Sequence, residues 1–144
     1  MSREYTGERF LPEECQGEIA AEHYQRYQFA KQFVKGKTVL DAACGEGYGS
    51  SLLAEEAAKV TGLDIDRNAV EKAGKKYGNE KLSYQSGSVE KLPFEDGNFD
   101  AVVSFETIEH VGEEVQKSFL REISRVLKPD GILIMSTPNK AVYT

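Results

Sequence analysis

The chain lacks the features that mark membrane proteins, disulfide-rich secreted proteins and nucleic-acid-binding proteins. No apolar run approaches the ~20 residues of a membrane span, and residues 1–5 do not begin an apolar signal-peptide core. The two cysteines, Cys15 and Cys44, provide neither a disulfide framework nor a metal-ligand spacing. The formal net charge is -6, whereas non-specific nucleic-acid binding requires clustered lysine and arginine. We therefore expect a cytoplasmic protein with no membrane partner and no non-specific binding of nucleic acid.

The order of apolar and polar segments predicts an α/β domain. Residues 1–17 are polar and interrupted by glycine and proline, so we interpret them as an N-terminal arm that precedes a core at 18–144. Helical spacing of apolar residues follows over 18–34. Strands are then predicted at 38–42, 59–64, 81–86, 99–104 and 131–137, and helices at 48–57, 67–77 and 113–127. Such alternation predicts a parallel sheet with helices on both faces and a ligand at the carboxyl ends of the strands.

A glycine-rich loop follows the first predicted strand. It reads A-C-G-E-G-Y-G over 43–49, and the second strand ends in Asp64. Glycine lets the backbone approach a ligand, the next helix offers free N–H groups, and the acid can accept the hydroxyls of a ribose. The pattern therefore predicts a nucleoside site. The dinucleotide spacing G-x-G-x-x-G is absent, because counting from Gly45 places Ser50 where the third glycine would stand.

Four further segments, in order, make the chain resemble the class I S-adenosylmethionine-dependent methyltransferases over about 37–139. They are G-L-D-I-D at 62–66, S-G-S-V-E-K-L-P-F at 86–94, the strand and loop at 98–111, and L-K-P-D-G-I-L-I at 127–134. The resemblance implies a Rossmann-like, doubly wound sheet in three αβα layers. The chain departs from the family pattern at two positions. Ala43 replaces a glycine, and Ser88 replaces an acid that would hold the adenine amino group.

The resemblance implies S-adenosyl-L-methionine as the cofactor, with Asp64 on the ribose and Ile65 on the adenine face. The residues expected to bind it are Arg26, Asp41, Ala43, Gly45, Gly47, Asp64, Ile65, Ser88, Val89 and Phe105. Asp41 either orders the glycine loop or bonds the amino group of the cofactor. Arg26 either clamps the cofactor carboxylate or belongs to a solvated helix face. A valine at Gly47 is expected to abolish cofactor binding with only a modest effect on folding.

The expected activity is methyl transfer to a small-molecule or saccharide acceptor, at a hydroxyl in preference to nitrogen or carbon. His110 is the candidate general base, because histidine titrates near neutrality. Glu106, Glu109 and His110 have the residue types of a divalent-cation site. The alternative is local helix capping or packing, and since the other histidine, His23, lies far upstream, we assign no metal. Alternative functions are a cofactor-binding module without catalysis and, less favoured, an NAD-dependent oxidoreductase.

The sequence ends just after the fifth predicted strand, whereas the family normally has seven. We therefore expect a truncated core in which 132–135 form an exposed apolar edge. Such edges recruit a second chain, so we expect a homodimer through this strand and little transfer activity.

Overall fold

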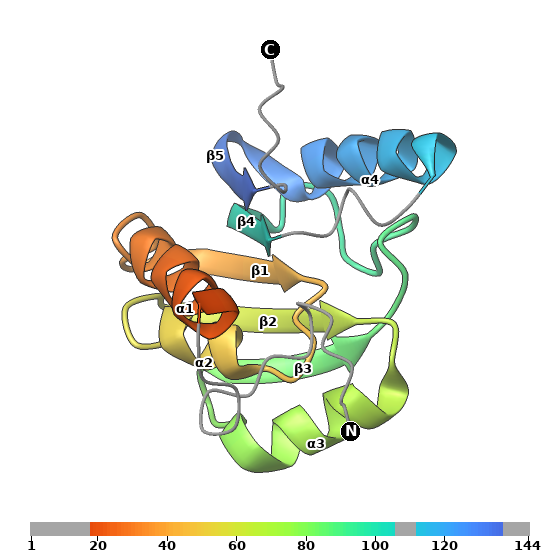
Figure 1. The fold of residues 1–144 in the computed structure, drawn as a ribbon. Coiled ribbons are helices and arrows are strands. Elements are labelled where there is room, and N and C mark those ends of the chain that lie inside the picture. Colours follow the sequence, from red (N-terminus) through yellow and green to blue (C-terminus); the bar gives the residue numbers. More distant parts are fainter. Residues whose placement is uncertain (1–17, 106–111, 137–144) are drawn as a thin grey trace.

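The computed structural model describes residues 18–105 and 112–136, and these form a five-stranded parallel sheet with four helices (Figure 1). The strand order is β3-β2-β1-β4-β5, and the pairs β1–β2, β1–β4, β2–β3 and β4–β5 are all parallel. The strands are β1 (Thr38–Ala42), β2 (Lys59–Asp64), β3 (Leu82–Ser86), β4 (Phe99–Phe105) and β5 (Leu127–Ser136). The helices are α1 (Glu18–Lys31), α2 (Tyr48–Leu53), α3 (Arg67–Tyr77) and α4 (Glu113–Val126). The predicted doubly wound α/β fold is confirmed.

Alternation along the strands produces two apolar cores, one on each face of the sheet. Val39 of β1 packs with α1 and α2, including Tyr27 and Leu53. The next residue, Leu40, points to the opposite face and packs with Phe119 of α4. Successive side chains of a strand point to opposite faces, so the near-continuous apolar sequence of β1 and β4 is explained by burial on both sides.

Element boundaries agree with the sequence prediction at β1, β2 and α3 and differ elsewhere. Asp66 caps α3, since its side chain accepts hydrogen bonds from the N–H groups of Asn68 and Ala69. The last strand starts at Leu127, not at 131, because Leu127 already pairs with Phe99 across a register shift. The segment through Pro129 is therefore extended, which agrees with the inability of proline to continue a helix.

Two further expectations concern exposed apolar residues. Tyr24 and Phe33, which belong to the helical apolar spacing of 18–34, are 41% and 44% exposed, so the buried face of α1 is narrower than its apolar pattern. On β5, Ile132 and Leu133 are 36% and 37% exposed, and β4 is the only strand that pairs with β5 within 18–105 and 112–136. In the same ranges no helix is both long and apolar enough to cross a bilayer.

Candidate functional site

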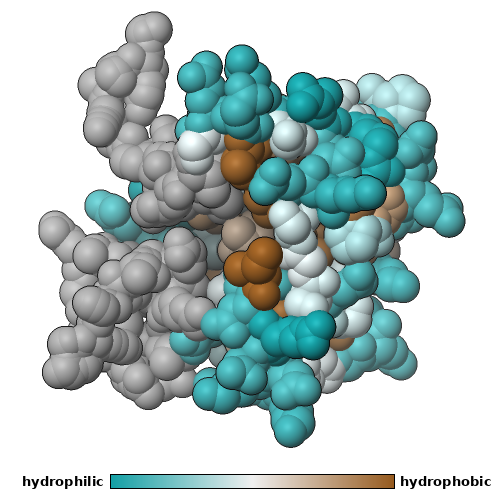
Figure 2. Space-filling model, turned by 90° about the vertical axis from the view of Figure 1, so that its right-hand side faces the viewer, coloured by the Kyte–Doolittle hydropathy of each residue, from teal (hydrophilic) through white to brown (hydrophobic). Residues whose placement is uncertain are grey.

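The candidate site lies where the order of strands reverses, at the carboxyl ends of β1, β2 and β4. From β1 the chain continues to β2 on one side, while β4 lies on the other, which leaves a crevice outside the strand ends. Figure 2 views the molecule from the side toward which β1 and β2 point in Figure 1, and hydrophobic side chains are open at the centre of a mainly hydrophilic face. This is the place predicted for the ligand.

The loop after β1 folds by repeated use of left-handed backbone. Ala43, Gly45 and Gly47 have φ values of 62°, 59° and 90°. The Cys44 N–H donates to the carbonyl of Leu63 at 2.8 Å, which joins the loop to β2. A left-handed alanine costs about 1–2 kcal/mol, so Ala43 occupies a glycine position at an energetic cost, which the surrounding contacts offset.

Asp64 connects the loop to the end of β2 with both of its carboxylate oxygens. Oδ1 accepts a hydrogen bond from the Gly45 N–H at 3.1 Å, and Oδ2 accepts one from the Asp66 N–H at 3.0 Å. A carboxylate has about four acceptor positions, so two remain for the vicinal hydroxyls of a ribose. Ile65 beside it is 73% exposed, an open apolar surface suited to the face of a base.

Ser88 and Val89 lie in a turn that follows β3 and is joined to the end of β2. The Gly87 N–H donates to the carbonyl of Asp64 at 3.1 Å. Within the turn, the Ser88 hydroxyl accepts from the Glu90 N–H at 3.0 Å. This bond leaves the Ser88 oxygen capacity to accept one more hydrogen bond, so the hydroxyl can still receive an adenine amino group.

Asp41 is fully buried at the end of β1 and is held by two hydroxyl groups. Ser50 of α2 donates to Oδ2 at 2.7 Å, and Tyr27 of α1 donates at 3.1 Å to Oδ1. Burial raises the pKa of Asp41 to about 7, although both hydrogen bonds oppose the shift and the charge of Asp64 adds to it. These contacts favour the loop-ordering role of Asp41 over direct contact with a ligand. Phe105 is also buried, with its ring edge-on to Tyr27 at a centroid distance of 4.8 Å.

Two tyrosines explain the need for glycine at Gly49, in the loop that the sequence analysis assigned to ligand approach, and at Gly62 of β2. A Cβ built at Gly49 would lie 2.1 Å from the ring of Tyr27. A Cβ built at Gly62 would lie 2.7 Å from the ring of Tyr84, whose hydroxyl donates to the carbonyl of Gly47 at 2.7 Å. These two glycines therefore make room for aromatic supports of the loop. Sequence reasoning missed this, since a tyrosine on α1 or β3 carries no local sign of its glycine partner.

At Gly47 itself the expectation of a modest folding effect is wrong. A Cβ there would lie 2.7 Å from the Cβ of Ala73 and 3.0 Å from the Tyr84 ring. A side chain at Gly47 would therefore press into the packing between the loop, α3 and β3, and not only into ligand space.

Three further residues belong to the loop or to α1, and they are Cys44, His23 and Arg26. Burial raises the pKa of the Cys44 thiol, which makes this residue a packing group. Burial and the nearby charge of Arg26 lower the pKa of His23 to about 4. Arg26 lies on α1 with a guanidinium nitrogen 3.9 Å from Glu22. His23 lines a small hollow together with Gly47 of the loop, whereas Arg26 does not line it.

The arm at 1–17, Glu106, Glu109 and His110 lie outside the described residues, so the base and metal hypotheses rest on sequence alone. Among the residues that are described, no group of three histidine, cysteine or acidic side chains is placed to hold a metal ion.

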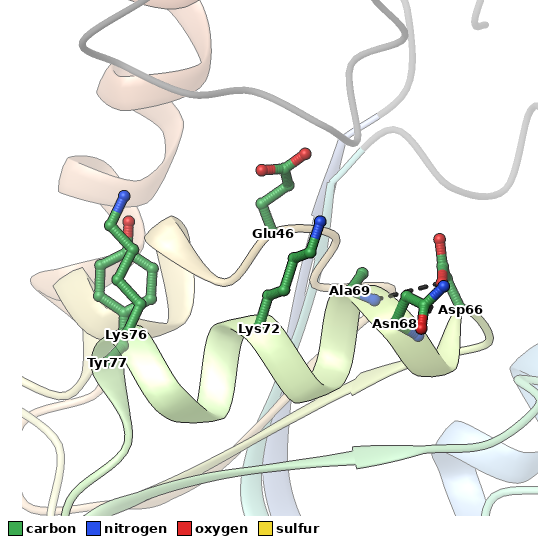
Figure 3. A pocket seen from close by; sticks show the side chains of 7 residues that line it. All are labelled: Glu46, Asp66, Asn68, Ala69, Lys72, Lys76 and Tyr77. Carbon is green, nitrogen blue, oxygen red and sulfur yellow. Dashed lines mark hydrogen bonds between the residues drawn. The ribbon is translucent and has the colours of Figure 1, made fainter.

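A second hollow of about 490 Å³ runs along α3 (Figure 3). Lys72 extends from α3 toward the loop at Glu46, whose carboxylate points away from α3, and Lys76 and Tyr77 lie at the end of α3 away from Asp66. Asp64, Ile65 and Ser88 do not line it. The hollow nevertheless adjoins the candidate nucleoside site, because Glu46 belongs to the glycine-rich loop and the N–H of Asp66 donates to Asp64.

Comparison with known proteins agrees with this geometry. A family model described as a methyltransferase domain matches residues 40–135. A protein of Mycolicibacterium smegmatis named probable S-adenosylmethionine-dependent methyltransferase is 37% identical over 145 residues, which cover 96% of this chain and 53% of the relative. A ubiquinone biosynthesis O-methyltransferase of Xanthomonas oryzae is 37% identical over 118 residues, covering 79% of this chain and 48% of the relative.

Among solved structures, the PH0226 protein of Pyrococcus horikoshii superposes with a TM-score of 0.73 at 30% identity, covering 83% of this chain and 58% of that chain. The chain spans about half the length of the curated relatives it matches. The family model and the 37% identical relative show the family of this chain, and the chain belongs to the methyltransferase domain family.

Proposed function

We propose that this chain binds S-adenosyl-L-methionine at the carboxyl ends of β1, β2 and β4 and takes part in transfer of its methyl group. The observation that carries the proposal is Asp64, which fixes Gly45 and retains two acceptor positions beside the exposed Ile65. Ribose hydroxyls and an adenine face match these two features. The family match and the name of the Mycolicibacterium relative support the same cofactor.

The sulfonium of this cofactor supplies an activated methyl group, so the protein chiefly has to align an acceptor with it. In this proposal Asp64 and Ile65 hold the nucleoside, Ser88 and Val89 hold the adenine edge, and the 43–47 loop lies beside the rest of the cofactor. For a hydroxyl acceptor a proton must also leave, and we assign this step to His110 as general base. Arg26 is the proposed partner of the cofactor carboxylate.

The proposed acceptor is a hydroxyl of a small molecule or saccharide. One relative is named an O-methyltransferase, which supports oxygen as the acceptor atom. A second candidate function is cofactor binding without catalysis, which the geometry of Asp64 and Ile65 supports equally well. We further propose that two copies associate through β5, where Ile132 and Leu133 are exposed on an edge strand.

Two experiments separate these functions. Calorimetric titration with S-adenosylhomocysteine and, in parallel, with NAD tests the cofactor, and we expect binding of the first alone. Transfer of radiolabelled methyl groups into a metabolite extract then distinguishes an enzyme from a binding module. Sedimentation at micromolar concentration tests the proposed dimer, and a monomer at these concentrations contradicts it.

A further inference from the structure

Arg125, near the end of α4, directs three hydrogen bonds of its guanidinium group to the segment that precedes β4 and two to Glu122 of its own helix. Its five hydrogen bonds go to both carboxylate oxygens of Glu122, to the carbonyls of Leu92 and Phe94, and to Oδ1 of Asp96, at 2.8–2.9 Å. A guanidinium has five N–H donors in a fixed planar fork. Every donor of Arg125 is therefore matched to an acceptor.

Hydrogen bonds also run in the other direction, from N–H groups of this segment to acceptors on α4. One acceptor is a side-chain oxygen and the other is a backbone carbonyl. The Leu92 N–H donates to Oε1 of Glu122 at 2.8 Å, and the Gly97 N–H donates to the carbonyl of Arg125 at 2.9 Å. Residues 92–97 are thus joined to one turn of α4 at Leu92, Phe94, Asp96 and Gly97. We call Arg125 and Glu122 the α4 clamp.

The clamp is partly shielded from water, so its bonds count for more than those of a surface ion pair. The side chains of Arg125 and Glu122 are 32% and 18% exposed. The bond from Arg125 holds the pKa of Glu122 below its usual range. Leu92, between them, is 2% exposed, and the ring of Phe94 packs edge-on to Phe99 at 5.1 Å.

The clamped segment continues directly from the proposed adenine turn. The carbonyl of Ser88 accepts from the Lys91 N–H at 3.3 Å, which closes the turn one residue before Leu92. Val89 packs against the same apolar core as Leu92. The position of the turn relative to Ile65 therefore depends on where α4 holds Leu92.

We infer that Arg125 and Glu122 are positioning residues, which place Ser88 and Val89 for recognition of the adenine amino group. This inference rests on the proposed function, because it takes the turn after β3 as the adenine contact. Neither side chain touches the cofactor in this account. Both act through the backbone of 92–97, and their removal loosens base selectivity as well as affinity.

The test compares two ligands that differ only at the base, S-adenosylhomocysteine and S-inosylhomocysteine, by calorimetry on the 144-residue chain. The wild-type chain is expected to prefer the adenine ligand by about tenfold, as for one lost hydrogen bond to a base edge. Arg125→Met removes all five bonds and is expected to reduce this preference at least about threefold. Arg125→Lys, which keeps the charge but not the planar fork, is expected to lie between them.

Lys128→Met is the matched control. It breaks the bond of Lys128 to Asp100 at 3.0 Å, an ion pair between β5 and β4. It lies at the opposite end of β4 from the site, so the ligand preference is expected to stay at the wild-type value.

The possible outcomes separate failure of the proposed cofactor binding from failure of the positioning role of Arg125 and Glu122. If the wild-type chain does not bind S-adenosylhomocysteine, the proposed function is wrong and the inference falls with it. If the wild-type chain binds and discriminates, but folded Arg125→Met discriminates equally well, the proposed function stands and the positioning role is wrong. A lower melting temperature at an unchanged preference also overturns the inference, since it shows a merely structural role. Where Arg125→Met does not fold, Arg125→Lys and Glu122→Gln supply the same comparison.

Discussion

The hydroxyl of Tyr27 on α1 lies 3.1 Å from Oδ1 and 3.2 Å from Oδ2 of Asp41 at the end of β1. Together with the 2.7 Å bond from Ser50, this contact joins α1, β1 and α2 around one buried carboxylate. The ring of Tyr27 also fills the space above Gly49. Removal of one partner therefore leaves a buried polar group without full compensation, which is more costly than the net value of the bond.

Tyr27→Phe is expected to lower the free energy of unfolding by about 1–3 kcal/mol, because Asp41 loses a donor while the ring packing remains. Tyr24→Phe is the control, since Tyr24 is on the same helix and 41% exposed. Its change should stay within about 0.5 kcal/mol. Urea unfolding of both variants measures the difference, and equal losses contradict the role given to the Tyr27 hydroxyl.

The pKa of Asp41, raised to about 7 by burial, predicts a pH-dependent stability. An unfolded aspartate titrates near ~3.9, so between about pH 4 and 7 the folded chain holds a proton that the unfolded chain has released. The contribution of Asp41 to the free energy of unfolding then falls as the pH rises through this window. His23, whose pKa is lowered to about 4, contributes in the opposite sense, because the unfolded chain holds its proton between about pH 4 and 6.5. For Asp100 and Glu122 the pKa is lowered, and their contributions are lost below the window, as the pH falls.

Asp41→Asn is expected to remove this fall, because the amide does not titrate. Denaturant unfolding of both chains from about pH 4 to pH 8 isolates the effect as a difference, with a slope of up to about 1.4 kcal/mol per pH unit. Parallel curves for the two chains would show that Asp41 is ionised throughout the folded state.

Gly47→Ala is expected to destabilise the fold more than Gly97→Ala. Both glycines have positive φ, 90° and 61°, so both alanines incur about 1–2 kcal/mol of left-handed strain. A Cβ at Gly97 meets nothing within 4 Å, whereas one at Gly47 meets Ala73 at 2.7 Å. Overpacking adds about 1–3 kcal/mol at Gly47 alone. Thermal unfolding of the pair measures the excess, and equal losses would mean that the loop moves aside without cost.

The alternation of strands and helices, the parallel sheet and the acidic end of β2 were predictable, because apolar periodicity and Asp64 are local signals. The start of β5 at Leu127 was not, since it depends on pairing with Phe99, far away in sequence. The narrow buried face of α1 was not predictable either, because it depends on which side chains of the helix contact the sheet. Local patterns define elements, while their ends are decided by neighbouring strands and helices.

Within the site, the positions proposed to face the ligand come from local sequence patterns, whereas the side chains that support them do not. Tyr27 and Tyr84 support the glycine loop through Gly49 and Gly62, and neither pairing is visible along the chain. The role of Arg125 was not predictable, because most of its acceptors are in another segment and two of them are backbone carbonyls. Non-local hydrogen bonds of this kind carry no residue pattern of their own.

The central claim is that Asp64 holds the ribose of S-adenosylmethionine, and calorimetric titration of S-adenosylhomocysteine into the Asp64→Ala chain tests it most directly. Hydrogen bonds to a charged group contribute ~1.5–3 kcal/mol, and ~1.4 kcal/mol is tenfold in affinity, so the account predicts about ten- to a hundredfold weaker binding. Asp64→Asn should weaken it less, because the amide oxygen still accepts one bond. Asp66→Ala, which removes only the cap of α3, controls for local destabilisation. Undiminished affinity in folded Asp64→Ala would contradict the account.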